Sequence, residues 1–169
     1  MGNSILLIGY GNPGRQDDGL GPALAEAVER LHLPGVTVES DYQLTVEDAA
    51  AVAAHRYVVF ADACVGEGEP FFFKAVQPTS GGSFSTHSVE PETVMALARD
   101  LFGADARGYA LGIRGYHFHE FGETLSEEAR ENLAAALRFI VPVLTDRTLD
   151  MAAGVAEGVD SPAQVRTHP

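Results

Sequence analysis

Apolar residues along this chain follow two alternating patterns. Short, continuous apolar or β-branched runs predict buried strands, which we expect at residues 5–8, 36–39, 57–61, 71–76 and 109–114. Between these runs, apolar residues recur every three or four positions. This spacing predicts helices over about 24–31, 46–55, 91–101 and 126–144. Strands that alternate with helices in this way are typical of a layered α/β fold.

The segment from residue 9 to residue 21 joins the first strand to the first helix and carries two adjacent acids. Its glycines follow the apolar run 5–8, and Asp17 and Asp18 come just before the helical spacing begins. Open α/β sheets place their functional sites at the carboxyl ends of the strands. The acid pair is therefore a candidate for catalysis or metal binding.

Three segments lie outside the regular pattern. Residues 77–88 are rich in Gly, Ser and Thr and predict a mobile surface loop. Pro142 is expected to kink or end the last helix. We expect a single domain over residues 1–145, followed by a polar C-terminal tail over 146–169 that has no fixed structure.

Composition narrows the functional class. The net charge of −13 argues against nucleic acid as a partner, because nucleic-acid binding depends on basic surfaces. No apolar run approaches the roughly 18 residues expected of a membrane span, so we expect no membrane partner. Cys64 is the single cysteine, which excludes an intrachain disulfide and fits a reducing compartment. We therefore expect a cytoplasmic protein.

The residues at the predicted strand ends indicate a metal or acid–base site. Asp18 follows the first strand, Asp62 ends the run 57–61, and His87 lies in the Gly/Ser/Thr loop. If the two strands are neighbours, both carboxylates meet at one sheet edge and the loop histidine can close over them. Two carboxylates and one imidazole suit a divalent first-row ion such as nickel or zinc, with positions left open for water or substrate. Each residue also has a simpler interpretation, as a helix cap, a turn residue and a solvated loop histidine.

Other candidates are weaker. The pattern Gly9-x-Gly11-x-x-Gly14 matches a dinucleotide fingerprint, but the acid pair would put negative charge beside a pyrophosphate. His117 and His119 would point the same way in an extended chain, where a solvated strand face is the simpler interpretation. Cys64 lies near Asp62, and a small, half-buried residue is expected there.

Taken together, these motifs resemble the nickel–iron hydrogenase maturation endopeptidases, which remove a C-terminal peptide from the hydrogenase large subunit. The similarity spans residue 5 to about residue 144. It is carried by the sequences GYGN (9–12), DDGLGP (17–22), VVFADA (58–63), STH (85–87), GIR (112–114) and the Glu123-x-Leu125-Ser126 motif. The resemblance implies a three-layer α/β/α sandwich around a mostly parallel, five-stranded sheet. It also implies that Asp18, Asp62 and His87 contact nickel that the immature subunit supplies, so that nickel is not a resident ion.

The resemblance implies a partner and leaves the chemistry open. The partner is the precursor of a nickel–iron hydrogenase large subunit, on which we expect a monomer to act. One hypothesis is that Asp18 and Asp62 hold or polarise the metal and that one of them activates a water. Another is that the acids only recognise nickel.

Two rival functions are also compatible with the sequence. A chaperone that checks the metal without cutting the precursor would use the same acids. Peptidyl-tRNA hydrolases carry a G-x-G-N-P-G motif that the sequence GYGNPG (9–14) matches, but no histidine occurs here before His32 to serve as their base.

Overall fold

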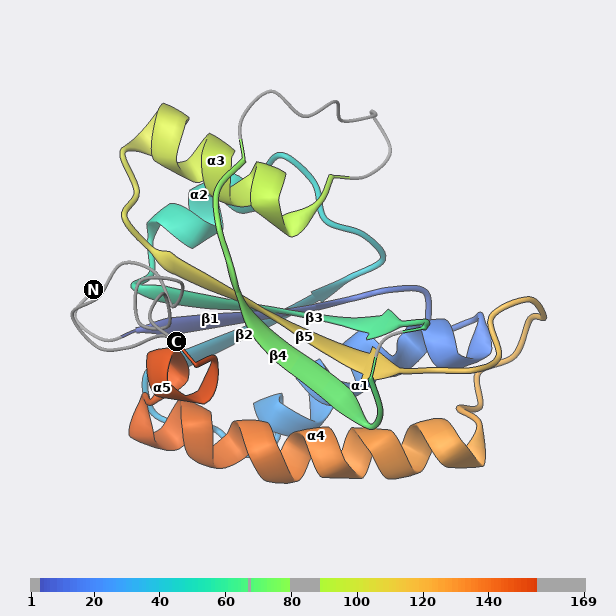
Figure 1. Cartoon of the computed structure of the whole chain (residues 1–169). Coiled ribbons are helices and arrows are strands. Elements are labelled where there is room, and N and C mark those ends of the chain that lie inside the picture. Colours follow the sequence, from blue (N-terminus) through green and yellow to red (C-terminus); the bar gives the residue numbers. More distant parts are fainter. Residues whose placement is uncertain (1–3, 67, 80–88, 155–169) are drawn as a thin grey trace, which may run out of the picture.

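The computed structural model describes residues 4–66, 68–79 and 89–154. A five-stranded sheet runs through the centre, in the order β2-β1-β3-β5-β4. Helices cover both of its faces and complete three layers (Figure 1). The strands are β1 (Ile5–Tyr10), β2 (Val36–Asp41), β3 (Tyr57–Cys64), β4 (Phe71–Val76) and β5 (Arg107–Arg114). The predicted α/β sandwich is confirmed.

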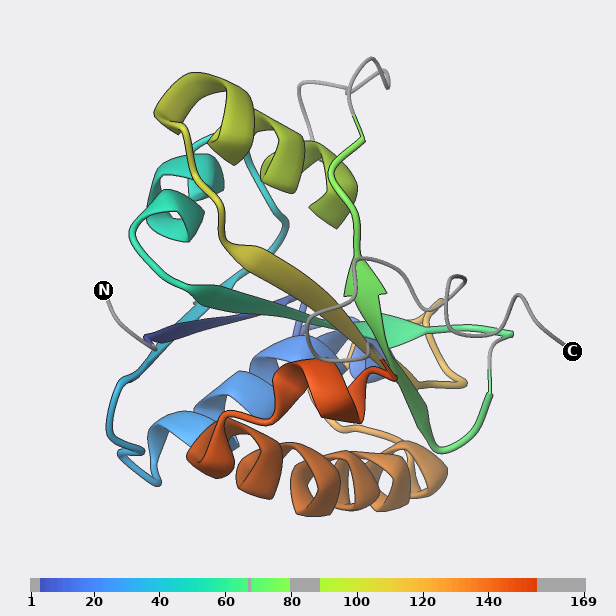
Figure 2. The ribbon, with the colours of Figure 1, turned by 60° about the vertical axis from the view of Figure 1, so that its left-hand side comes forward.

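The helices lie in two groups. One face of the sheet carries α2 (Asp48–Ala53) and α3 (Pro91–Phe102), as Figures 1 and 2 show. The other face carries α1 (Leu20–Glu29), α4 (Glu127–Asp146) and the short α5 (Leu149–Ala152). A 3₁₀ turn, η1 (Gln16–Gly19), precedes α1. The chain therefore alternates between strands and covering helices, as the sequence pattern predicts.

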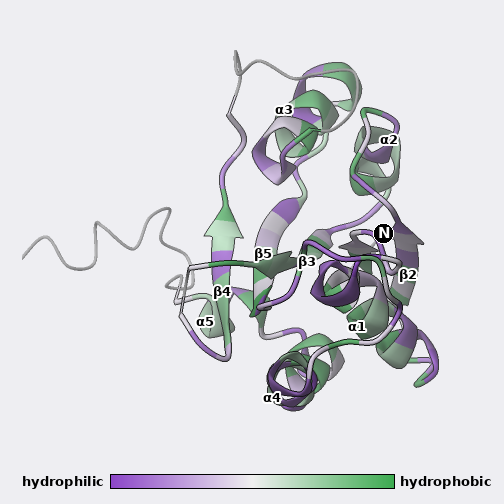
Figure 3. Ribbon diagram, turned by 90° about the vertical axis from the view of Figure 1, so that its right-hand side faces the viewer, coloured by the Kyte–Doolittle hydropathy of each residue, from purple (hydrophilic) through white to green (hydrophobic). Residues whose placement is uncertain are grey.

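Strand direction places the loops that matter for function. β2, β1, β3 and β5 are parallel, and only the edge strand β4 is antiparallel to its neighbour. The carboxyl ends of the four parallel strands therefore meet at one edge of the sheet. Figure 3 views the molecule from this side. β1 and β3 are direct neighbours, with Gly9 in register with Ala61.

The apolar character of β1 follows from its place between two cores. Ile5 and Leu7 pack with α1 and α4, whereas Leu6 and Ile8 pack with α2 and α3. All four side chains are buried. A parallel strand that is covered on both faces needs apolar residues at every position, which explains the continuous run in the sequence.

Glycines let the turn after β1 approach the strand ends closely. A Cβ at Gly21, in the first turn of α1, would lie 2.4 Å from the carbonyl oxygen of Tyr10 and 2.5 Å from that of Ala61. A Cβ at Gly9 would lie 2.2 Å from the carbonyl oxygen of Gly21. Only glycine permits this contact between helix and sheet, which brings η1 against β3.

The C-terminal boundary differs from the expectation. α4 continues through Pro142 to Asp146, and α5 follows, so the tail does not begin at residue 146. Val143, Leu144 and Leu149 are buried in the core, and their burial offsets the hydrogen bond that Pro142 cannot donate. α4 therefore does not end at Pro142, which was one of the two outcomes expected for that proline. The remainder of the expected tail lies outside the described residues.

None of the helices that the structure describes is both long enough and apolar enough to cross a bilayer.

We predict that Gly21→Ala destabilises the fold by about 1–3 kcal/mol or more, because backbone carbonyls on two strands leave no room for the added methyl group. Gly68→Ala is the matched control, since a Cβ there meets no atom within 4 Å. Thermal or urea unfolding measures both variants. Equal stability of the two variants would contradict the close approach of α1 to the sheet.

Candidate functional site

The structure brings two of the three predicted site residues to the same sheet edge. Asp62 lies near the end of β3, and Asp18 lies in η1, which contacts β3. The Asp18 carboxylate accepts a hydrogen bond from the backbone N–H of Asn12 at 2.8 Å. A Cβ at Gly11 would lie 2.1 Å from the carbonyl oxygen of Asp18, so glycine is needed for this turn. Asp18 is thus held by the loop that leaves β1.

Asp62 is a half-buried carboxyl that faces other acids. Burial raises its pKa to about 7, and the negative charges of Asp18 and Glu90 act in the same direction as burial. Hydrogen bonds from the backbone N–H of Ala63, at 2.7 Å, and from the Tyr10 hydroxyl act in the opposite direction. A carboxyl group with a pKa near neutrality can both accept and donate a proton at physiological pH, which is the requirement for general acid–base chemistry.

Tyr10 and Glu90 were not among the predicted site residues. Tyr10 ends β1, beside the end of β3, and burial together with the neighbouring acids raises its pKa above its usual range. It therefore remains a neutral hydrogen-bond donor to Asp62. Its position at a strand end could have suggested this contact. Nothing in the local sequence around Glu90 points to Asp62, because the two come together only when α3 packs onto the sheet.

Asp17 has a different role from Asp18. Its side chain is fully buried and accepts hydrogen bonds from the backbone N–H groups of Tyr116, His117 and Ser126 and from the Ser126 hydroxyl, at 2.8–3.0 Å. Burial disfavours the charged form, yet these four donors hold the pKa of Asp17 below its usual range. The sequence pairs the two acids, but the fold separates them into a structural anchor and a site residue.

The anchor fixes the loop that follows β5. Gln16 donates its backbone N–H to the carbonyl oxygen of Gly122, and Gly122 donates its own to Gly14. Together with the bonds to Asp17, these contacts hold residues 115–126 against the segment that carries Asp18.

Cys64 is half-buried, as expected, and lies at the end of β3. His87 lies outside the described residues, so its predicted approach to Asp18 and Asp62 stays a prediction. Residues 115–120 form no strand, which corrects the extended chain expected for His117 and His119. The backbone N–H of Gly115 still donates to the carbonyl oxygen of Cys64 at the end of β3, but those of Tyr116 and His117 donate to the Asp17 carboxylate. Within residues 4–66, 68–79 and 89–154, no three His, Cys, Asp or Glu side chains form a cluster able to hold a metal ion.

We predict that the Asp62→Asn variant is more stable than wild type at about pH 8, and that its advantage shrinks toward about pH 4. The raised pKa means that folded Asp62 keeps a proton that the unfolded chain loses near pH 4. Its contribution to stability is therefore present below that pH and is lost as the pH rises through about 7. Melting temperatures measured across this range test the prediction, with Asp105→Asn, on an exposed residue, as control. A pH-independent difference would contradict it.

We predict that Asp17→Asn lowers the free energy of unfolding by about 2 kcal/mol or more. The amide NH₂ group of asparagine replaces one carboxylate oxygen, and it cannot accept the hydrogen bonds that this oxygen accepts in wild type. Hydrogen exchange should show loss of protection at the amides of Tyr116, His117 and Ser126. Full protection at these amides in a folded Asp17→Asn protein would show that Asp17 does not anchor the loop.

Comparison with known proteins supports the fold and the family resemblance. No family model and no curated protein sequence matches this chain. Among solved structures, the chain is similar to the nickel–iron hydrogenase maturation protease HycI from Thermococcus kodakarensis KOD1, with 26% identity over 84% of this chain and 92% of that one and a TM-score of 0.65.

Two further structures share the fold at lower identity. The hydrogenase maturating endopeptidase HybD from E. coli has a TM-score of 0.68 at 18% identity, over 85% of this chain and 93% of that one. A hydrogenase 2 maturation peptidase from a Thaumarchaeota archaeon has a TM-score of 0.62 at 20% identity, over 84% of this chain and 98% of that one. The structural comparisons confirm the resemblance to the hydrogenase maturation endopeptidases that the sequence motifs predicted.

Proposed function

We propose that this protein is an endopeptidase that removes the C-terminal peptide from the nickel-loaded large-subunit precursor of a nickel–iron hydrogenase. The observation that carries the proposal is the convergence of Asp18 and Asp62 beside the ends of β1 and β3, in a chain that shares the fold of hydrogenase maturation proteases. Acids at a strand edge suit the recognition of a metal ion presented by a client protein.

Nickel enters this proposal as part of the substrate. Asp18 and Asp62 would contact the ion held by the precursor, and His87 would supply a third contact. The carboxylates suit a divalent ion, but two carboxylates alone bind such an ion weakly. The protein would therefore bind nickel that the precursor already holds in preference to free nickel. The acids thereby act as a check that the client is loaded before it is cut.

Peptide hydrolysis requires a proton to move from water to the leaving amine. We assign this proton to the Asp62 carboxylate, through the oxygen atom that does not contact nickel. As the oxygen of water bonds to the scissile carbonyl carbon, ionised Asp62 takes the proton of the water. As the carbon–nitrogen bond breaks, Asp62 returns that proton to the nitrogen of the released peptide. The Tyr10 hydroxyl, which donates to Asp62, orients the carboxyl group during both steps.

The cellular setting follows from the same proposal. We place the protein in the cytoplasm, where the precursor is made, and expect one copy to act on one precursor. The net charge of −13 disfavours association between copies of this chain.

We predict that purified wild-type protein shortens the nickel-loaded precursor and leaves the nickel-free precursor intact. Asp62→Asn should slow cleavage by roughly 10²–10⁴-fold, the range for loss of a general base, and Asp18→Asn should weaken discrimination between loaded and empty precursor. Mass spectrometry of the precursor measures the cut, and Asp105→Asn serves as control. A wild-type protein that binds the loaded precursor without shortening it would replace this proposal by the metal-checking chaperone. Normal cleavage by Asp62→Asn would remove Asp62 from the mechanism.

A further inference from the structure

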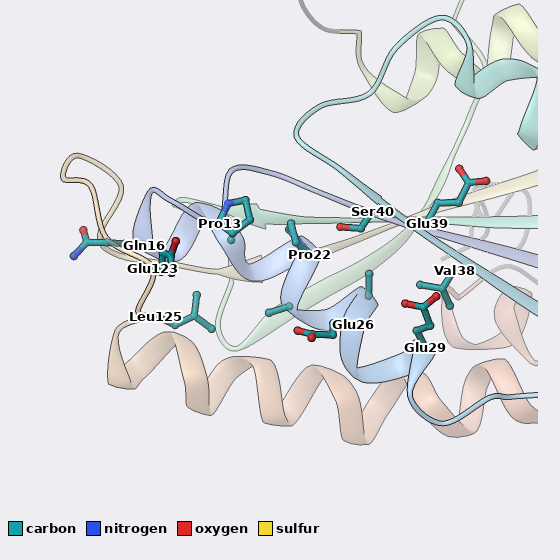
Figure 4. A pocket seen from close by; sticks show the side chains of 13 residues that line it. Pro13, Gln16, Pro22, Glu26, Glu29, Val38, Glu39, Ser40, Glu123 and Leu125 are labelled. Atoms are coloured by element: carbon teal, nitrogen blue, oxygen red, sulfur yellow. The ribbon is translucent and has the colours of Figure 1, made fainter.

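A groove of about 530 Å³ lies between α1 and the edge strand β2, outside the acidic pair. Figure 4 shows Glu26 and Glu29 projecting from α1 on one side, with Val38 and Ser40 of β2 on the other. Pro13 and Pro22 line the end nearest the site-bearing turn. The groove is therefore built by the same loop–helix segment that carries Asp18.

The groove runs along an open sheet edge. β2 is the outermost strand and pairs only with β1 in the described sheet. Val36 and Val38 are half-buried toward α1, whereas the other four residues of β2 are exposed. At about 3.3 Å per residue, this strand offers roughly 20 Å of edge, which matches five or six residues of an extended peptide.

The groove leads toward the acidic pair. A smaller hollow of about 230 Å³ shares Pro13, Pro22 and Ser40 with it and extends to Gly11. Gly11 in turn lies against the backbone of Asp18, because a Cβ added at Gly11 would come within 2.1 Å of the Asp18 carbonyl oxygen. A chain lying along β2 would therefore reach the site without leaving the surface.

Charge decides what kind of chain fits. Glu26, Glu29 and Glu123 border the groove, and no lysine or arginine is among its lining residues. Arg30 neutralises Glu26 through a 2.9 Å ion pair, but within the described parts of the chain neither Glu29 nor Glu123 forms an ion pair. Glu39 of β2 also lines the groove and adds negative charge to this edge (Figure 4). A second copy of this acidic chain would be repelled, and so would a nucleic acid.

We propose that the β2 edge and this groove dock an extended, basic segment of the client precursor and lead the precursor chain toward Asp18 and Asp62. The inference rests on the proposed function for the identity of the client. Main-chain hydrogen bonds along β2 would align the segment, while Glu29 and Glu123 would select its lysine or arginine side chains.

Cross-linking tests this docking without relying on cleavage. A photo-reactive benzoylphenylalanine placed at Ser40 of the Asp62→Asn protein should cross-link to the nickel-loaded precursor, at a segment rich in lysine or arginine. The same group at Asp100, on the exposed side of α3, should not cross-link. Cross-links from Ser40 to an acidic segment or to a second copy of this chain, or no cross-link at all, would overturn the inference.

Kinetics separate docking from the proposed chemistry. Glu29→Lys combined with Glu123→Lys should raise KM for the precursor roughly tenfold and weaken its dependence on salt, with kcat and melting temperature unchanged. Glu131→Lys on the exposed part of α4 makes a like charge change outside the groove and should leave KM unaltered. If wild type cleaves but the double variant keeps its KM, the docking inference fails and the proposed function stands. If cross-linking succeeds but wild type does not cleave, the docking stands and the peptidase proposal fails.

Discussion

The contact between the turn after β1 and the ends of β1 and β3 determines the rest of the site. Gly9, Gly11 and Gly21 allow backbone to meet backbone there at distances that no side chain would permit. Because η1 is held against β3, Asp18 stays close to Asp62. The two carboxyl groups therefore lie side by side in a partly buried position. A strand–turn–helix connection is thereby converted into a site with a protonatable carboxyl group.

The adjacent acids Asp17 and Asp18 have different roles in this arrangement. Asp17 turns inward, where four hydrogen-bond donors stabilise its charge and fix the loop of residues 115–126. Asp18 remains at the edge, bonded to the N–H of Asn12 and close enough to Asp62 to disfavour its ionisation. The rigid anchor makes the reactive pair possible, because like charges would otherwise separate into solvent. Asp17 thus stabilises the fold, whereas Asp18 and Asp62 repel each other, as is common at functional sites.

Sequence reasoning succeeded where local pattern decides structure and failed where distant segments meet. The apolar run of β1 and the helical stripes predicted the sandwich, and the glycine-rich turn marked Asp18 and the correct sheet edge. The burial of Asp17 could not be predicted, because its donors lie about a hundred positions away in the chain. Pro142 does not end α4, because burial of the apolar residues after it outweighs the loss of one helical hydrogen bond at the proline. The effect of the Glu90 charge on Asp62 depends on how α3 packs onto the sheet, and the local sequence does not indicate that packing.

Asp18 and Asp62 form one electrostatically coupled site. An NMR titration of the Asp62 side-chain carboxyl carbon, in wild type and in Asp18→Asn, tests it most directly. Coupling predicts a wild-type pKa of about 7 that falls when the neighbouring charge is removed. A wild-type value near that of a free aspartate, or a raised value that does not change in Asp18→Asn, would contradict the account.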